Sequence, residues 1–296
     1  MVARCVSYSV SGTIRWIVIP PFLNDAGYRA AVAAATEKAG LRLHDIDLDP
    51  APPEIDGSDT VFLTADAHKA LAAGVAAEAL ACIISDQGMR LLGDEDQDAL
   101  PPHIAIFTDL MGRTALLPQD RVFRDADFVS GPIEILPGIR VERPALGSTA
   151  LSPRLQAVTR AVALLDPSSP TAFWAPELFN YDSRRIPGGK PGELDLTGRP
   201  RFMITGPYIT LPAGRWRATY RLTFDAKGSR VRFRTDWGGQ TDFISEEFTP
   251  GRPGVFEIVQ EYEWKEPAPC ELRVVVLEGV FDGRMTFSGA EISRIS

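Results

Sequence analysis

The chain has 296 residues, enough for two domains of ordinary size. Its hydrophobic content of 45% and charged content of 24% are those of a soluble globular protein, and its net charge of -8 argues against nucleic-acid binding through overall positive charge. We expect a cytoplasmic protein, because no apolar run is long enough to span a membrane and the N-terminal segment is not a convincing signal peptide. The widely spaced Cys5, Cys82 and Cys270 are expected to be reduced thiols.

The first half of the chain alternates between strands of the buried type and helices. Strands are predicted at residues 15–20, 41–48, 60–64, 81–85 and 103–108. Helices are predicted at residues 26–39 and 67–80, and a short one begins at residue 87. This alternation predicts a parallel α/β sheet with helices on both faces, in a Rossmann-like or flavodoxin-like order. A proline-rich loop, in which no helix is predicted, joins the second strand to the third.

Three of these strands end in an acidic residue, at Asp66, Asp86 and Asp109, and His68 closely follows the first. Ligands of open parallel sheets bind beyond the carboxyl ends of the strands. The three aspartates and His68 are therefore candidate catalytic residues. The alternative is that the aspartates cap helices, because Asp is a preferred N-cap residue, and Asp66 and Asp86 fit that role directly.

The usual motifs for phosphate, nucleophile and metal chemistry are absent from the sequence. No GxGxxG follows the first strand, and neither a GxxxxGK[ST] loop nor a GxSxG elbow occurs. The histidines His44, His68 and His103 are dispersed and have no cysteine or histidine at zinc-site spacing. We therefore predict no cofactor and no metal site.

The middle of the chain separates two different sequence patterns. An amphipathic helix with Pro153 in its first turn is predicted over 152–165, and we expect it to pack on the α/β domain. Residues 167–195 are rich in proline and glycine but carry four aromatic side chains, which indicates an ordered connector. The predicted organisation is an α/β domain at 1–166, this connector, and an all-β domain at 196–296.

The second half of the chain is predicted to contain only strands. Between Arg215 and Phe224, apolar and polar residues alternate strictly, which is typical of a strand with one face in a core. We assign Trp216 to that buried face. Further strands are predicted at residues 230–237, 242–249, 255–264, 272–277 and 285–295. Short strands separated by regular turns, without helices, predict a β-sandwich of the jelly-roll type.

The polar faces of these strands have two interpretations. Arginines dominate the outer face of two strands and glutamates that of a third, so cross-strand Arg–Glu pairs would explain both. The alternative is a polar face that binds sugar hydroxyls, with an aromatic platform at its edge. Candidate ligand-binding residues for that edge are Asp236, Trp237 and Gln240, beside a Gly-Gly turn, and Trp264 at another strand end.

The segment GPYITLPAGRWRATYRLTF, preceded by DLTGRPRFMI, resembles the opening of a jelly-roll domain attached to bacterial glycosyltransferases and other surface-polysaccharide proteins. That domain is similar to carbohydrate-binding modules, and the resemblance covers residues 193–296. It implies a glycan-binding or accessory protein of bacterial surface-polysaccharide biosynthesis, with a polysaccharide or sugar-linked intermediate as ligand and a glycosyltransferase as partner. Residues 1–192 resemble no known family.

Two other functions stay open at this point. One is a glycosyltransferase or hydrolase whose active site lies at the strand ends of the first domain. The other is a protein-interaction module that binds no sugar. Homo-oligomerisation is compatible with each of the three interpretations.

Overall fold

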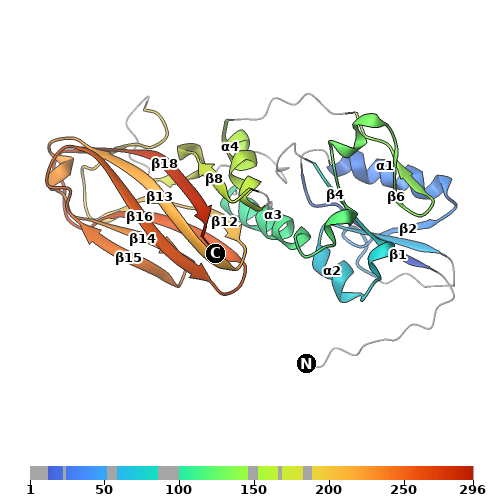
Figure 1. The fold of residues 1–296 in the computed structure, drawn as a ribbon. Coiled ribbons are helices and arrows are strands. Elements are labelled where there is room, and N and C mark those ends of the chain that lie inside the picture. Colours follow the sequence, from blue (N-terminus) through green and yellow to red (C-terminus); the bar gives the residue numbers. More distant parts are fainter. Residues whose placement is uncertain are drawn as a thin grey trace. The chain divides into compact units, whose positions relative to one another are not determined.

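The computed structural model describes residues 13–22, 25–51, 59–85, 100–145, 153–165, 169–182 and 189–295. The chain divides into two compact units, shown in Figure 1. The first unit comprises residues 1–90 and 113–148, and the second comprises residues 91–112 and 149–296. This division differs from the expected boundary at residue 166, because the second unit begins earlier and also takes a stretch from within the predicted first domain.

A five-stranded sheet forms the centre of the first unit. Its strands are β1 (Ile14–Val18), β2 (Arg42–Asp45), β3 (Thr60–Thr64), β4 (Leu80–Ile84) and β5 (Val122–Arg124). All four strand pairings are parallel, and the order is β2-β3-β1-β4-β5. The parallel sheet is therefore confirmed, but its order is neither the Rossmann nor the flavodoxin order. Strands β3 and β4 are buried along their whole length, which explains their continuous apolar sequences.

Short helices and one hairpin complete the first unit. These elements are α1 (Asp25–Lys38), α2 (Ala67–Ala72), η1 (Ala77–Ala79), η2 (Gln119–Arg121), η3 (Asp127–Ser130), β6 (Ile133–Leu136) and β7 (Ile139–Val141). Helix α2 is shorter than the helix predicted over 67–80, because Gly74 takes a positive φ of 65° just after it. The hairpin strand β7 contacts α1.

The strand predicted over 103–108 is instead part of helix α3 (Leu100–Thr114), so this prediction was wrong. Its buried residues Ile104, Phe107 and Thr108 follow the i, i+3, i+4 spacing of a helix face, whereas Ile106 is exposed. A short apolar run fits a strand and a buried helix equally well, and here the helical spacing decides.

The second unit is built mainly from antiparallel strands. They are β8 (Thr171–Trp174), β9 (Asn180–Tyr181), β10 (Glu193–Asp195), β11 (Arg201–Thr205), β12 (Pro207–Leu211), β13 (Gly214–Phe224), β14 (Phe233–Gly238), β15 (Phe243–Phe248), β16 (Gly254–Trp264), β17 (Ala268–Val276) and β18 (Arg284–Arg294). One sheet has the order β10-β18-β13-β16, with β8 beside β18, and the other has the order β15-β14-β17-β11-β9, with β12 beside β17. Aromatic rings from both sheets meet between them, as Phe224 and Phe233 do at 4.8 Å. The predicted β-sandwich is confirmed.

The segment predicted as a connector supplies strands to this sandwich. Strands β8 and β10 pair with β18, and β9 pairs with β11. Helix α4 (Pro153–Ala161), followed by η4 (Val162–Leu165), contacts β8 and η5 (Pro176–Leu178) in the second unit. The expectation that this helix packs on the α/β domain was therefore wrong.

Helix α3 also contributes to the second unit, through strand β12. The backbone N–H of Thr210 donates to the Thr108 hydroxyl at 2.8 Å, and the Thr210 hydroxyl donates to the Ala105 carbonyl at 3.2 Å. Elsewhere, Cys82 and Cys270 are buried and free, whereas Cys5 lies outside the described residues. No helix in the described part of the chain is long and apolar enough to cross a membrane.

Candidate functional site

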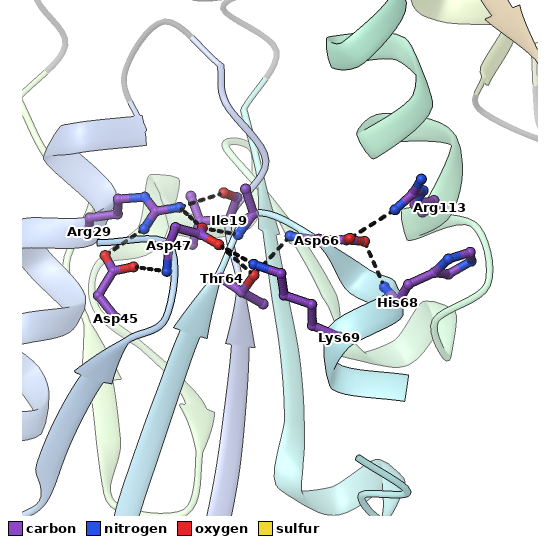
Figure 2. A network of polar contacts seen from close by, with 10 residues as sticks. Ile19, Arg29, Asp45, Asp47, Thr64, Asp66, His68, Lys69 and Arg113 are labelled. Carbon is purple, nitrogen blue, oxygen red and sulfur yellow. Dashed lines mark hydrogen bonds and ion pairs between the residues drawn. The ribbon is translucent and has the colours of Figure 1, made fainter. Parts of the chain in front are cut away.

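Asp66 acts as the cap of a helix, as the structural alternative predicted. Its Oδ1 accepts a hydrogen bond from the backbone N–H of His68 at 2.9 Å, and its Oδ2 accepts one from Arg113 Nη1 at 2.8 Å (Figure 2). Both carboxylate oxygens are therefore engaged by protein groups. The His68 side chain is exposed.

The other two candidate catalytic aspartates do not join Asp66 at the edge of the sheet. Asp109 lies inside helix α3, in the stretch that belongs to the second unit, because the strand that was to end there does not exist. Asp86 lies outside the described residues. The predicted acidic pocket is thus not assembled among the residues that the structure describes.

The carboxyl edge of β1, β2 and β3 instead carries a network centred on Asp47, which follows β2 in a turn (Figure 2). Asp47 Oδ1 accepts from the Thr64 hydroxyl and from Lys69 Nζ, each at 3.0 Å. Its Oδ2 accepts from the backbone N–H of Ala65 at 2.5 Å and from Arg29 Nη2 at 3.0 Å. One carboxylate therefore receives four donors from three separate segments of the chain.

Arg29, on helix α1, links Asp47 to strand β2 and to the residue that follows β1. It forms an ion pair with Asp45 at 2.6 Å, and its Nη2 also donates to the Ile19 carbonyl at 3.4 Å. Partial burial acts to lower the pKa of Arg29, but the two carboxylates outweigh this effect and raise the pKa. The sequence analysis missed this arginine and both aspartates, although the alternating segment LRLHDIDL places Asp45 and Asp47 at the end of a strand.

The Asp47 network makes the first unit sensitive to acid. Partial burial acts to raise the pKa of Asp47, but the four groups that donate to it outweigh burial and hold the pKa below its usual range. A lowered pKa contributes stability that is fully present above the unfolded value of about 4 and is lost as the pH falls through the folded value. We expect Asp47→Asn to flatten the loss of stability below about pH 4, measured by urea unfolding across a pH series. If the free energy of unfolding of Asp47→Asn falls as steeply below about pH 4 as that of the wild type, the lowered pKa of Asp47 does not stabilise the first unit.

A second polar cluster, not predicted from sequence, lies at the ends of β4 and β5. Asp125 follows β5, and its carboxylate accepts from the hydroxyls of Tyr28 and Ser85, each at 2.6 Å. All three residues are buried. Burial, followed by the neighbouring Asp125, raises the pKa of Tyr28 well above its usual value, so the phenol stays protonated as a donor. The three residues are far apart in sequence, so no local motif could have revealed the cluster.

Metal ligation has no support in the described part of the chain. No group of three or more His, Cys, Asp or Glu side chains lies close enough there to hold a metal ion.

In the second unit, the two tryptophans predicted to form an exposed platform are buried. Trp237 is 0% exposed and Trp264 4% exposed, and their ring centroids lie 5.3 Å apart. The ring centroid of Trp174, from β8, lies 5.9 Å from that of Trp237. The interpretation of these rings as a sugar platform is corrected, because they fill the space between the two sheets.

The remaining predicted ligand-binding residues are Asp236, on strand β14, and Gln240, in the turn after it. Asp236 is fully buried, pairs with Arg234 at 2.9 Å and accepts from the Ser245 hydroxyl at 2.7 Å. Gln240 is exposed, and its backbone carbonyl accepts from Arg273 at 2.9 Å. Of the four predicted residues, only Gln240 is therefore open to solvent.

The Arg–Glu interpretation is confirmed for the first of the two arginine-bearing strands, β13, but not for the arginines of residues 230–237. Glu261 on β16 forms ion pairs with Arg215 at 2.7 Å and Arg217 at 2.6 Å, and Glu257 pairs with Arg221 at 3.0 Å. These pairs join β13 to β16 across the register of the sheet. Hydrogen bonds and positive charge from Arg217, and then from Arg215, hold the pKa of the Glu261 carboxyl below its usual value.

Among the described residues of the second unit, the most exposed large apolar side chain is Phe281, at the end of the sandwich opposite the Gly238-Gly239 turn. Phe281 is 98% exposed and lies in the loop between β17 and β18. Two backbone hydrogen bonds of 2.8 Å between Gly198 and Val280 hold one side of this loop. On the other side Gly283 packs so closely that a Cβ atom there would lie 2.9 Å from the Gly228 nitrogen. The ring is therefore exposed on a loop whose backbone is held in place.

Exposed cationic side chains surround the same end of the sandwich. The loop that carries Arg252 is joined to the loop that carries Arg230 by a 2.7 Å bond from Gly251 N–H to the Ser229 carbonyl. Arg199 lies next to Gly198, which pairs with the Phe281 loop. Within the described residues, these three arginine side chains have neither a hydrogen-bond nor an ion-pair partner. Lys227 in the same region pairs with Asp282.

Comparisons with known proteins give no family for the chain. No family model matches the sequence, and no curated protein matches it. Solved structures that resemble part of the chain include the family 61 carbohydrate-binding module TmCBM61 in complex with β-1,4-galactotriose, at 13% identity over 44% of this chain and 85% of that one, with a TM-score of 0.29. Another is the C-terminal family 6 module of LamC from Zobellia galactanivorans, at 15% identity over 42% and 99% of the two chains, with a TM-score of 0.29. A third is the xylan-binding CBM22-1 domain of Xyn10C from Paenibacillus barcinonensis, at 8% identity over 43% and 82%, with a TM-score of 0.25. TM-scores this low do not establish a shared function.

Proposed function

We propose that this chain is a glycan-binding protein and that its second unit holds the sugar at the loop end of the sandwich, around Phe281. The observation that carries the proposal is the complete exposure of this ring on a loop fixed by backbone pairing. An aromatic ring presents a flat apolar surface, and one face of a pyranose ring is apolar as well. Because the loop is already ordered, little conformational entropy is lost when a sugar stacks on the ring.

The charges near Phe281 supply the polar half of such a site. Arg199, Arg230 and Arg252 are exposed donors, and the Lys227–Asp282 pair offers both a donor and an acceptor. Sugar hydroxyls and acidic sugar substituents accept hydrogen bonds from guanidinium groups. The binding edge is thereby placed at the opposite end of the sandwich from the rim expected from sequence.

The wider role that we propose is that of an accessory protein in bacterial surface-polysaccharide biosynthesis. It would act in the cytoplasm beside a glycosyltransferase, which extends a polysaccharide or a sugar-linked intermediate. The support for this role is the resemblance of residues 193–296 to domains attached to such enzymes. No specific observation among the described residues favours catalysis in the first unit, because Asp66 is occupied as a cap and Asp109 lies in a helix.

The proposal is tested with Phe281→Ala in the full chain, after a glycan array has identified a ligand. We expect calorimetry to show an affinity loss of about tenfold or more, since covering a phenylalanine side chain with the apolar face of a sugar contributes about 1.5–3 kcal/mol. The melting temperature should not change, because the exposed ring buries nothing. The matched control is Phe202→Ala, which removes another exposed phenylalanine (51% exposed) from strand β11.

Two results would count against the proposal. If no oligosaccharide binds the protein, the second unit is an interaction module and glycan binding is excluded. If Phe281→Ala and Phe202→Ala bind the identified glycan as tightly as the wild type, the sugar site lies elsewhere.

A further inference from the structure

We propose that the carboxyl edge of the parallel sheet carries a cradle for the phosphoryl group of a ligand, and that Asp47 occupies this cradle as an internal carboxylate. The inference concerns the first unit and does not depend on glycan binding by the second. Asp47 is the centre of Figure 2, where side chains from α1, β3 and α2 converge on one carboxylate.

The four groups around Asp47 are those that commonly bind phosphate oxygens. They are a backbone N–H (Ala65), a hydroxyl (Thr64), an ammonium (Lys69) and a guanidinium (Arg29), all between 2.5 and 3.0 Å from the carboxylate. A structural cap usually receives one or two backbone donors, as Asp66 does from His68. The donor set at Asp47 is larger and carries two full positive charges.

The charge balance favours an anion in this position. Arg29 and Lys69 contribute two positive charges, and Asp45 and Asp47 contribute two negative ones. Without Asp47 the cluster would keep one net positive charge and four unfilled donor directions. A phosphate monoester carries a charge of about -1.5 to -2 at neutral pH and three acceptor oxygens, so it matches this donor set better than a single carboxylate does.

The place in the fold is also the one where open α/β sheets bind ligands. The cradle lies beyond the carboxyl ends of β2 and β3, which are adjacent and parallel in the five-stranded sheet. Thr64 and Ala65 follow directly from β3 at this point.

Asp47 is held in a manner that a ligand can reverse. It lies in the turn at 46–48, and the neighbouring Leu48 is 83% exposed, so that side chain does not pack the turn against the sheet. The side chains of Asp47 and Lys69 are 24% and 45% exposed, which leaves the cradle open on one side. Hydrogen bonds from the Ile46 N–H to the Leu63 carbonyl and from the Asp47 N–H to Asp45 Oδ1 hold the turn itself. The Asp47 carboxylate is held by the polar contacts that a phosphoryl group would replace.

The test is a titration of Asp47→Ala with inorganic phosphate and with glucose 1-phosphate, followed by the amide resonance of Ala65 in the full chain. We expect saturable shifts of that resonance, with an affinity about tenfold or more above that of the wild type, because the internal competitor is gone. Asp45→Ala is the matched control, since Asp45 shares Arg29 but contacts neither Thr64 nor Lys69 in the described structure. Adding Lys69→Ala to Asp47→Ala should abolish the gain.

The binding results either support the cradle or overturn it. Tighter binding of the ester identifies a phosphorylated metabolite and equal binding identifies free phosphate, and both support the cradle. If acetate binds Asp47→Ala as tightly as phosphate does, the site accepts any carboxylate-sized anion without preference for phosphate, and the proposal is overturned. Asp47→Asn keeps the size of the side chain and serves if the alanine variant does not fold. If neither variant binds phosphate better than Asp45→Ala does, the proposal is likewise overturned.

Discussion

Replacing Trp237 with alanine is expected to destabilise the second unit by about 3–5 kcal/mol, the usual cost of removing a large aromatic side chain from a core. Trp237 is fully buried between the sheets and contacts the rings of Trp174 and Trp264. Its loss would leave a cavity that touches strands from both sheets. Because four of the five tryptophans of the chain lie in the second unit, tryptophan fluorescence during denaturant unfolding reports mainly on this unit.

The matched control is Trp237→Phe. The indole N–H groups of Trp174, Trp237 and Trp264 are buried and have no acceptor in the described structure, so the phenylalanine variant loses ring volume but no hydrogen bond. We expect it to cost clearly less than the alanine variant. A cost for Trp237→Ala near that of an exposed substitution such as Phe202→Ala would show that the ring does not hold the two sheets together.

Replacing Asp125 with alanine is expected to destabilise the first unit by about 2–6 kcal/mol, because two buried hydroxyls lose their acceptor and each costs about 1–3 kcal/mol. The hydroxyls belong to Tyr28 on α1 and Ser85 at the end of β4, so the carboxylate joins three elements of the fold. Hydrogen exchange read by mass spectrometry would follow the strands of the first unit separately from the sandwich.

Two further variants sharpen the Asp125 measurement. Asp120→Ala removes an exposed carboxylate from η2, which forms no hydrogen bond or ion pair in the described part of the chain, and should leave exchange unchanged. Tyr28→Phe removes one hydroxyl donor and should cost less than Asp125→Ala, because the Ser85 hydroxyl still donates to the other carboxylate oxygen. Unchanged protection of β4 and β5 in Asp125→Ala would contradict the role of this cluster.

The sequence pattern predicted burial correctly for side chains whose surroundings depend on their own strand. The alternation between Arg215 and Phe224 placed Trp216 in the core, and the structure confirms it at 1% exposed. The same alternation placed arginines and glutamates on one outer face, where they pair. The alternative interpretation of Asp66, as a helix cap and not a catalytic residue, is confirmed, because the residue type and its position before a helix carry that information.

The sequence pattern gave wrong predictions where contacts with residues far along the chain determine burial or secondary structure. Trp237 and Trp264 stand at strand ends beside turns, which suggested exposure, but Trp174 from the segment predicted as a connector lies against Trp237 in the core. The apolar run at 103–108 fitted a strand, yet the helix that it forms is anchored through Thr108 to strand β12, far along the chain.

By itself, the sequence determined the two kinds of architecture in this protein, a parallel α/β sheet and an antiparallel sandwich. Strand and helix periodicities are short-range properties of the backbone, so they are readable from adjacent residues. Only the tertiary structure decided which side chains are accessible and which polar groups converge. Phe281 is exposed because no segment in the described part of the chain covers its side chain. The Asp47 cradle collects residues 29, 64, 65 and 69 from separate elements. Burial and convergence depend on long-range packing, which the spacing of residues along the chain does not encode.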